Sequence, residues 1–167
     1  YLLGDSILQF STIIGSYLFA MGVGAGLSKF VKKKKLVHLF IDIEIAISII
    51  GGVSSLLLMM VFFYLSPSFK PSLYGLVFMV GLMVGMEIPI VMRILHKDGG
   101  EIKDMISNVL SFDYLGALFI SLMFPLVFMP YLGINRTAIA FGFANLAIGF
   151  LTLKNFSTSF SNKQINI

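Results

Sequence analysis

Two acidic residues, Glu87 and Asp113, each stand inside a long apolar stretch of this sequence. A carboxylate inside a membrane-crossing helix is costly unless it is paired or faces a polar cavity. Two such groups close together could share a proton or hold a cation jointly. Asn108 and Tyr114 stand near Asp113 in the sequence and could serve as its partners. We therefore predict an intramembrane polar cluster of Glu87, Asp113, Tyr114 and Asn108.

The composition indicates the elements that must position this cluster. Of the 167 residues, 57% are apolar and only 12% are charged, whereas a soluble domain is about 25% charged. The chain is therefore predicted to be an all-α integral membrane protein with the lipid bilayer as its main partner. Its basic residues gather at a few span ends, which favours a role in orientation and not in nucleic-acid binding.

Apolar runs and the polar turns between them predict a bundle of about five transmembrane helices within residues 1–153. The residues that follow, 154–167, are rich in Ser and Asn and are predicted to be a polar cytoplasmic tail or linker. The predicted spans cover residues 7–30, 39–65, 73–95, 105–129 and 137–153.

Basic residues predict the orientation of the bundle. The first span is followed by Lys29 and then by an unbroken run, Lys32, Lys33, Lys34 and Lys35. Such runs mark the cytoplasmic side and could also attract anionic lipid. With this end inside, only Lys70 and Arg136 fall outside. The N-terminus is then outside and the C-terminus is in the cytoplasm.

The loop between the third and fourth spans is short, so these helices are predicted to form an antiparallel hairpin. Glu87 and Asp113 both lie roughly 12–14 Å from the inner ends of their helices, at 1.5 Å per residue. They should therefore stand at similar depth. Pro89 and Pro125 are predicted to kink the two helices. The alternative is that each acid has a separate partner, such as a backbone group freed by Pro89.

Other patterns have structural interpretations. Gly22, Gly24 and Gly26 are predicted to allow close packing of a neighbouring helix, because no strand precedes them as a nucleotide-binding loop would require. Asp42 and Glu44 come early in the second span and point about 200° apart on a helix. They are predicted to reach the membrane interface separately.

No catalytic site is recognisable. The sequence lacks HExxH, GxSxG and P-loop motifs, and it has no Cys for a nucleophile or thiolate site. His96 has no second ligand nearby, so no metal site is predicted. Paired acids alone do not specify a reaction.

Several segments together resemble the membrane domain of the spermidine synthase-like family, which consists of bacterial polyamine aminopropyltransferases with N-terminal transmembrane helices. The most specific elements are FDYLGA and the GxExP pattern of GMEIP. The resembling segments are YLLGDSILQFSTIIGSYLFAMGVGAGLSKF (1–30), GMEIPIVMRIL (85–95), NVLSFDYLGALFISLMFPLVFMPYLGINRTA (108–138) and GFANLAIGFLTL (142–153).

The resemblance implies a location in the bacterial cytoplasmic membrane. It also implies that one helix precedes this segment in the family, and that a further helix and a cytoplasmic catalytic domain follow it. That domain binds decarboxylated S-adenosylmethionine and putrescine in a Rossmann-like fold. Nothing in this chain matches its glycine-rich loop or catalytic aspartate, so no cofactor and no catalytic residue are predicted here.

Three functions remain open at this point. The bundle could anchor or regulate an aminopropyltransferase and bind polyamine or a related metabolite near Glu87 and Asp113. It could be half of a secondary carrier of the major facilitator kind, which would have to form a homodimer. It could also be a structural anchor in which the acids only lock the hairpin.

Overall fold

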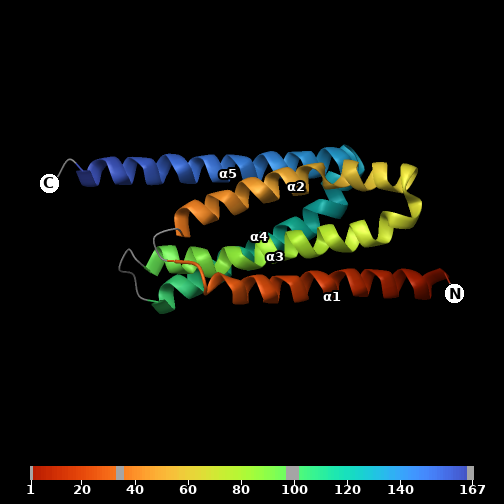
Figure 1. The fold of residues 1–167 in the computed structure, drawn as a ribbon, viewed down its shortest axis with the longest axis horizontal. Coiled ribbons are helices and arrows are strands. Elements are labelled where there is room, and N and C mark those ends of the chain that lie inside the picture. The colour runs from red at the N-terminus through yellow and green to blue at the C-terminus, as the bar shows by residue number, and fades with distance from the viewer. Residues whose placement is uncertain (1, 33–35, 97–101, 165–167) are drawn as a thin grey trace.

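The computed structural model describes residues 2–32, 36–96 and 102–164, and these contain helices and short connections but no strand. The connection between α2 and α3 is a short 3-10 turn, and α4 leads into α5 through a π-helical segment (Figure 1). The elements are α1 Leu2–Ser28, α2 Leu36–Tyr64, η2 Ser66–Ser68, α3 Phe69–Leu95, α4 Ile102–Met123, η4 Phe124–Leu132 and α5 Gly133–Gln164.

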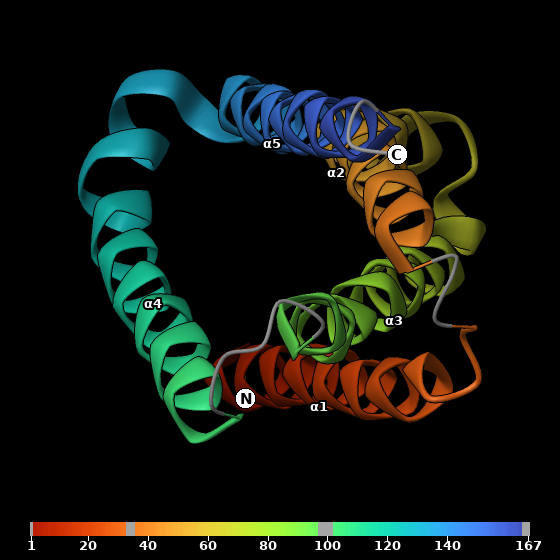
Figure 2. The same ribbon diagram turned by 90° about the vertical axis from the view of Figure 1, so that its left-hand side faces the viewer.

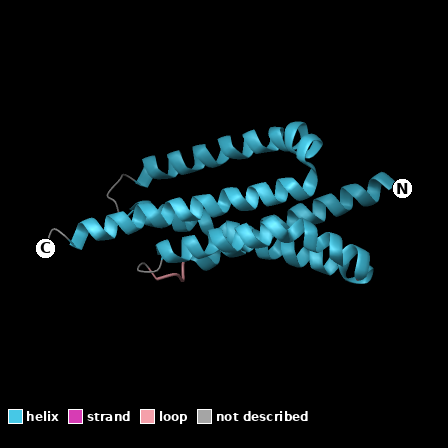
Figure 3. Cartoon of the chain, turned by 90° about the horizontal axis from the view of Figure 1, so that it is seen from above, coloured by secondary structure: helices cyan, strands magenta, loops and turns pink. Residues whose placement is uncertain are grey.

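Four helical stretches of the described chain are long and apolar enough to cross a membrane, which makes a membrane location plausible. The last of them has 49 residues and contains most of α4, all of η4 and most of α5. The long helices run along one common direction (Figure 1, Figure 3). The four stretches are Ser6–Ser28, Leu36–Tyr64, Phe69–Leu95 and Ile106–Lys154.

The bundle is built from two closely packed pairs. Helix α1 packs along α3, α2 packs along α5, and a contact between α2 and α3 joins the pairs (Figure 2). The buried apolar cluster lies at this central contact, where Ile90 of α3 meets Leu36, Ile43 and Ile47 of α2. The centre of the bundle is therefore the α2–α3 contact.

Helix α4 packs less than the other helices. Its contacts are mainly with α3 and with η4, and it forms a separate side of the arrangement in Figure 2. Of its described side chains, only Val109, Leu110 and Met123 are half-buried, and the others are exposed. The position of α4 is thus determined mostly at its two ends.

The junction between α4 and α5 differs from the predicted turn at residues 130–136. The helix widens into π-helical turns over Phe124–Leu132, and the chain breaks direction at Gly133, whose φ is +72°. Pro125 and Pro130 both lie in this segment. Proline removes a backbone donor and clashes with the preceding turn, so two prolines in one short segment disfavour a regular α-helix here, whereas α3 continues past its single Pro89.

The end of α5 also differs from expectation. Residues 154–164 were predicted to be a tail or linker, but they are the last turns of α5. This stretch contains no Gly or Pro that would stop a helix. Of the predicted lysine run, Lys32 is exposed, whereas Lys33, Lys34 and Lys35 lie outside the described residues.

Candidate functional site

Glu87 lies in α3 beside the central apolar contact. It is half-buried, and it is followed three residues later by Ile90, which is fully buried against α2. Positions three and four apart share one side of a helix, so Glu87 lies on the side of α3 that adjoins α2. Pro89 is inside the same helix and frees a backbone carbonyl one turn earlier.

A second acid, Glu44 of α2, is buried, with 7% of its surface exposed. It was predicted to reach the membrane interface, but α5 covers it instead. A Cβ built on Gly149 of α5 would lie 3.4 Å from the Cβ of Glu44, so the glycine allows α5 to approach this closely. Asp42, two residues earlier and on the opposite side of the helix, is exposed.

Asp113 completes a group of three acids on three helices. It is exposed, and it shares a side of α4 with Val109 and Leu110, the residues that neighbouring helices partly cover. The charges of Asp113 and Glu44 both act on Glu87. We call Glu44, Glu87 and Asp113 the acid cluster.

The hydroxyl of Tyr17 on α1 borders the acid cluster, because the charges of Glu87 and Asp113 reach it. Within the part of the chain that the structure describes, no hydrogen bond or ion pair to the three carboxylates is found. The same residues include no group of His, Cys, Asp or Glu that could hold a metal ion. The carboxylates are thus near enough to interact but do not converge on one small ion.

The structure does not bring all the predicted cluster residues together. Asn108 and Tyr114 are both exposed, and they point about 140° and 100° away from Asp113 around α4, at 100° per residue. Glu44 and Tyr17 interact with the acids instead of Asn108 and Tyr114, although the sequence interpretation did not include them in the cluster. The equal spacing of Glu44, Ser48 and Gly52 along α2 could have indicated that Glu44 lies on the packed side of this helix, because residues four apart share one helix side.

The α1–α3 contact depends on glycines from both helices. A Cβ on Gly24 would overlap the carbonyl oxygen of Leu82, and a Cβ on Gly85 would overlap that of Met21. Gly22 and Gly26, which were predicted together with Gly24, would have nothing within 4 Å of an added Cβ. Only Gly24 of the three faces α3, and Gly85 was not predicted.

The α2–α5 contact has a similar construction. Gly52 and Gly142 face each other, and the added Cβ of Gly142 would lie 3.0 Å from the Cα of Gly52. Beside them the hydroxyl of Ser48 donates a 2.6 Å hydrogen bond to the carbonyl of Gly142. This contact holds α5 over Glu44.

Arg93 joins the end of α3 to the end of α1. Its guanidinium donates hydrogen bonds of 2.6 Å to the carbonyl of Ser28 and 2.7 Å to the carbonyl of Val31. The sequence analysis assigned no contact to Arg93. Its fork of donors matches the carbonyls exposed at and just after a helix C-terminus, and a sequence alone does not show where these carbonyls lie.

Comparisons with known proteins place the chain beside polyamine aminopropyltransferases. It is 52% identical over 156 residues to polyamine aminopropyltransferase 2 of Ralstonia nicotianae, covering 93% of this chain and 31% of that protein. It is also 52% identical over 156 residues to polyamine aminopropyltransferase 1 of the same organism, covering 93% and 30%. It is 47% identical over 148 residues to the polyamine aminopropyltransferase of Leptospira interrogans, and this match covers 89% of this chain and 29% of that protein.

The chain spans about a third of the length of these relatives, and the match lies in their N-terminal part. No family model matches the chain. No solved structure matches it either.

Proposed function

We propose that this chain is the membrane-embedded N-terminal part of a polyamine aminopropyltransferase, where it anchors a cytoplasmic catalytic part and binds a polyamine at the acid cluster. Support for the first half is the high identity to the N-terminal part of enzymes with that name. The apolar helices support the membrane location. Decarboxylated S-adenosylmethionine would be a substrate of the catalytic part and not of this one.

The distribution of charge supports an orientation for the bundle. The end of α1 and the end of α5 lie at the same end of the bundle (Figure 1), and Lys32, Arg93 and Lys154 are near that end. Lys70 and Arg136 are at the opposite end, with the start of α1. We propose five crossings, with the N-terminus outside and the C-terminus in the bacterial cytoplasm. A catalytic part that follows α5 would then be cytoplasmic.

The observation that carries the ligand proposal is the acid cluster. Its three carboxylates stand on three helices, the charges of Glu44 and Asp113 both reach Glu87, and no cationic partner is found among the described residues. Unpaired acids in apolar helices are expected to face a ligand or a polar cavity. A polyamine has several ammonium groups separated by short methylene chains. Carboxylates that are spread out and bordered by apolar side chains suit that ligand better than they suit one small cation.

Binding of spermidine to the purified protein tests this proposal. The ligand is titrated onto protein in neutral detergent, and the heat of binding is measured. We expect Glu87→Gln and Glu44→Gln to weaken binding by about 10-fold or more each, since a hydrogen bond to a charged group contributes about 1.5–3 kcal/mol. Asp42→Asn is the matched control, because it removes the same charge from an exposed position of α2.

Equal affinity in the wild type, Glu87→Gln and Glu44→Gln would refute a role for the acid cluster in binding. The same protein in liposomes shows whether binding leads to transport. Polyamine uptake by the wild type that is lost in Glu87→Gln would indicate a carrier. Destabilised variants without any spermidine binding in the wild type would indicate a structural anchor.

The anchoring half has a separate test. The intact mass of the protein extracted from its native membrane should exceed 18.4 kDa by at least one domain, about 100–200 residues or more. A mass near 18.4 kDa would show that the bundle exists without a fused catalytic part.

A further inference from the structure

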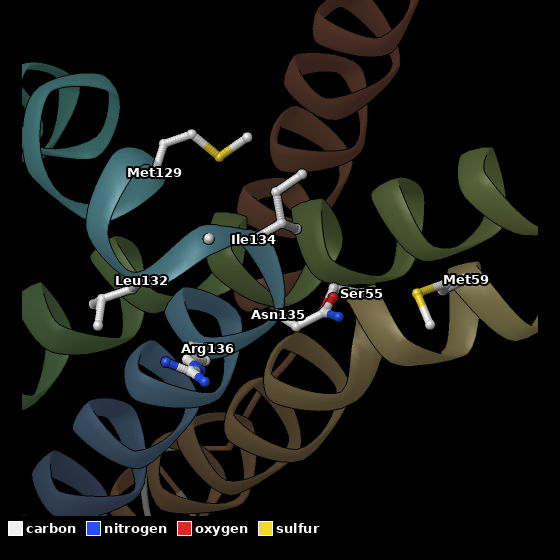
Figure 4. Close-up of a pocket in the computed structure, with 8 residues that line it drawn as sticks. Ser55, Met59, Met129, Leu132, Ile134, Asn135 and Arg136 are labelled. Carbon is white, nitrogen blue, oxygen red and sulfur yellow. The ribbon is translucent and has the colours of Figure 1, made fainter.

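A cavity of about 700 Å³ opens at the end of the bundle that carries Arg136, where α2 meets η4 and the start of α5. This volume is within the range of small-molecule sites, about 300–1,000 Å³. We call it the outer cavity. The residues that line it are Ser55, Met59, Met129, Leu132, Gly133, Ile134, Asn135 and Arg136 (Figure 4).

The bend of the chain creates the outer cavity. The π-helical turns of η4 end at Gly133, where the positive φ turns the backbone into α5. Thr137 is 1% exposed, and its hydroxyl is 2.7 Å from the carbonyl oxygen of Gly133 and 3.3 Å from that of Phe128. These contacts fix the bend between η4 and α5, so the cavity between this bend and α2 is a fixed feature of the structure.

The lining has a polar part. Arg136 is exposed and Asn135 is half-buried, and both belong to the first turn of α5. Backbone N–H groups in a first helical turn have no acceptor within the helix. Ser55 of α2 also lines the cavity, and its hydroxyl oxygen is buried without a hydrogen-bond partner among the described residues. The polar part of the lining therefore consists of one cation, one side-chain amide and one hydroxyl.

The rest of the lining is apolar. Met59 of α2 and Met129 and Leu132 of η4 are 48%, 42% and 40% exposed. Methionine side chains are flexible and adapt to irregular apolar ligands. A free small anion would leave these side chains uncovered, whereas a molecule with an anionic group and an apolar chain would contact both parts of the cavity.

We propose that the outer cavity binds an anionic phospholipid, with its phosphate at Arg136 and Asn135 and the start of an acyl chain on Met59, Met129 and Leu132. The planar fork of arginine matches phosphate oxygens. The cavity lies at the ends of helices, where lipid headgroups meet a membrane protein. Ser55 is about 16 Å along α2 from Glu44, at 1.5 Å per residue, so this site is separate from the acid cluster.

The test uses the whole protein as extracted from the membrane and exchanged into neutral detergent. Phosphatidylglycerol with short acyl chains is titrated, and the bound lipid is counted by native mass spectrometry. Arg136→Gln should weaken binding about 10- to 100-fold, the range for losing hydrogen bonds to a charged group. Lys70→Gln is the matched control, because Lys70 is the exposed cation at the same end but outside the cavity.

Two further probes separate the lipid from its parts. Zwitterionic phosphatidylcholine should bind more weakly than phosphatidylglycerol, and inorganic phosphate should not displace the bound lipid at equal concentration. If Arg136→Gln and Lys70→Gln bind equally, or if free phosphate competes as well as the lipid, the proposal is overturned. Met59→Asn, which keeps the cation but makes the apolar part polar, should also weaken binding. Unchanged binding in that variant would exclude the acyl-chain contact.

Discussion

Replacement of Gly24 by alanine tests the α1–α3 contact. An added Cβ would overlap the carbonyl oxygen of Leu82 and lie 2.9 Å from its carbonyl carbon. Ordinary contacts begin at 3.4 Å, so the carbonyl carbon alone requires a displacement of about 0.5 Å to restore an ordinary contact. The obstacle is backbone, which cannot rotate away as a side chain would.

We expect Gly24→Ala to destabilise the fold by about 1–3 kcal/mol, the typical cost of overpacking. For a chain of this size that lowers Tm by about 2–12 °C. The same substitution at Gly22 or Gly26 meets nothing within 4 Å, so these variants should be as stable as the wild type or slightly more stable, since alanine favours helix. They are matched controls in the same helix.

The chain contains no Trp, so its unfolding is not followed by tryptophan fluorescence. A suitable assay heats the detergent-solubilised protein and measures the fraction that still elutes as a single species in size-exclusion chromatography. Equal midpoints for Gly24→Ala and Gly22→Ala would refute the contact. A loss in Gly24→Ala alone would support it, and Gly85→Ala should then add less than its separate effect, because both glycines serve one contact.

Three further predictions concern other contacts. Arg93→Gln should cost about 1.5–3 kcal/mol per charged hydrogen bond and speed hydrogen exchange at the end of α1, whereas Arg93→Lys should restore this only in part because lysine lacks the fork. Ser48→Ala should lower the stability by about 0.6–1.7 kcal/mol, and Ser54→Ala, whose bond is within α2, should have a smaller effect in the same heating assay. Gly133→Ala should cost about 1–2 kcal/mol because φ is positive there, while Gly116→Ala, also without neighbours within 4 Å, should be neutral; equal midpoints for the two would contradict that reason.

The helical character of the chain followed from its composition and apolar runs, because these do not depend on how helices rotate. The similar depth of Glu87 and Asp113 stays a prediction from residue counts, and the charge of Asp113 reaches Glu87 in the structure. The side of each helix was harder to predict. Gly22, Gly24 and Gly26 look alike in the sequence, but only a known rotation of α1 selects Gly24.

Glu44 shows a second limit of the sequence. Its place near the lysine run suggested an interfacial acid, and nothing nearby in the sequence indicates that Gly149, more than 100 residues later, lies against it. The extra turns at Phe124–Leu132 were likewise beyond prediction. Two prolines indicate that a helix is disturbed, but a turn and a π-helical bend both satisfy that requirement.

The sparse packing of α4 gives Asp113 a role in the rotation of this helix. A helix held mainly at its ends has little side-chain contact to set its rotation about its own axis. Turning Asp113 from the bundle toward lipid would cost about 2.5–3.5 kcal/mol on insertion scales, which disfavours that orientation about 60- to 300-fold. The charge of Asp113 would then fix the rotation of α4 about its axis and keep one side of the helix toward the bundle. In the other helices, packed side chains fix the rotation. Asp113→Leu should leave α4 helical but free to rotate about its axis. Single cysteines placed around α4 report this rotation. In the variant they should all react equally with a water-soluble thiol reagent, whereas in the unsubstituted protein they should react to different extents.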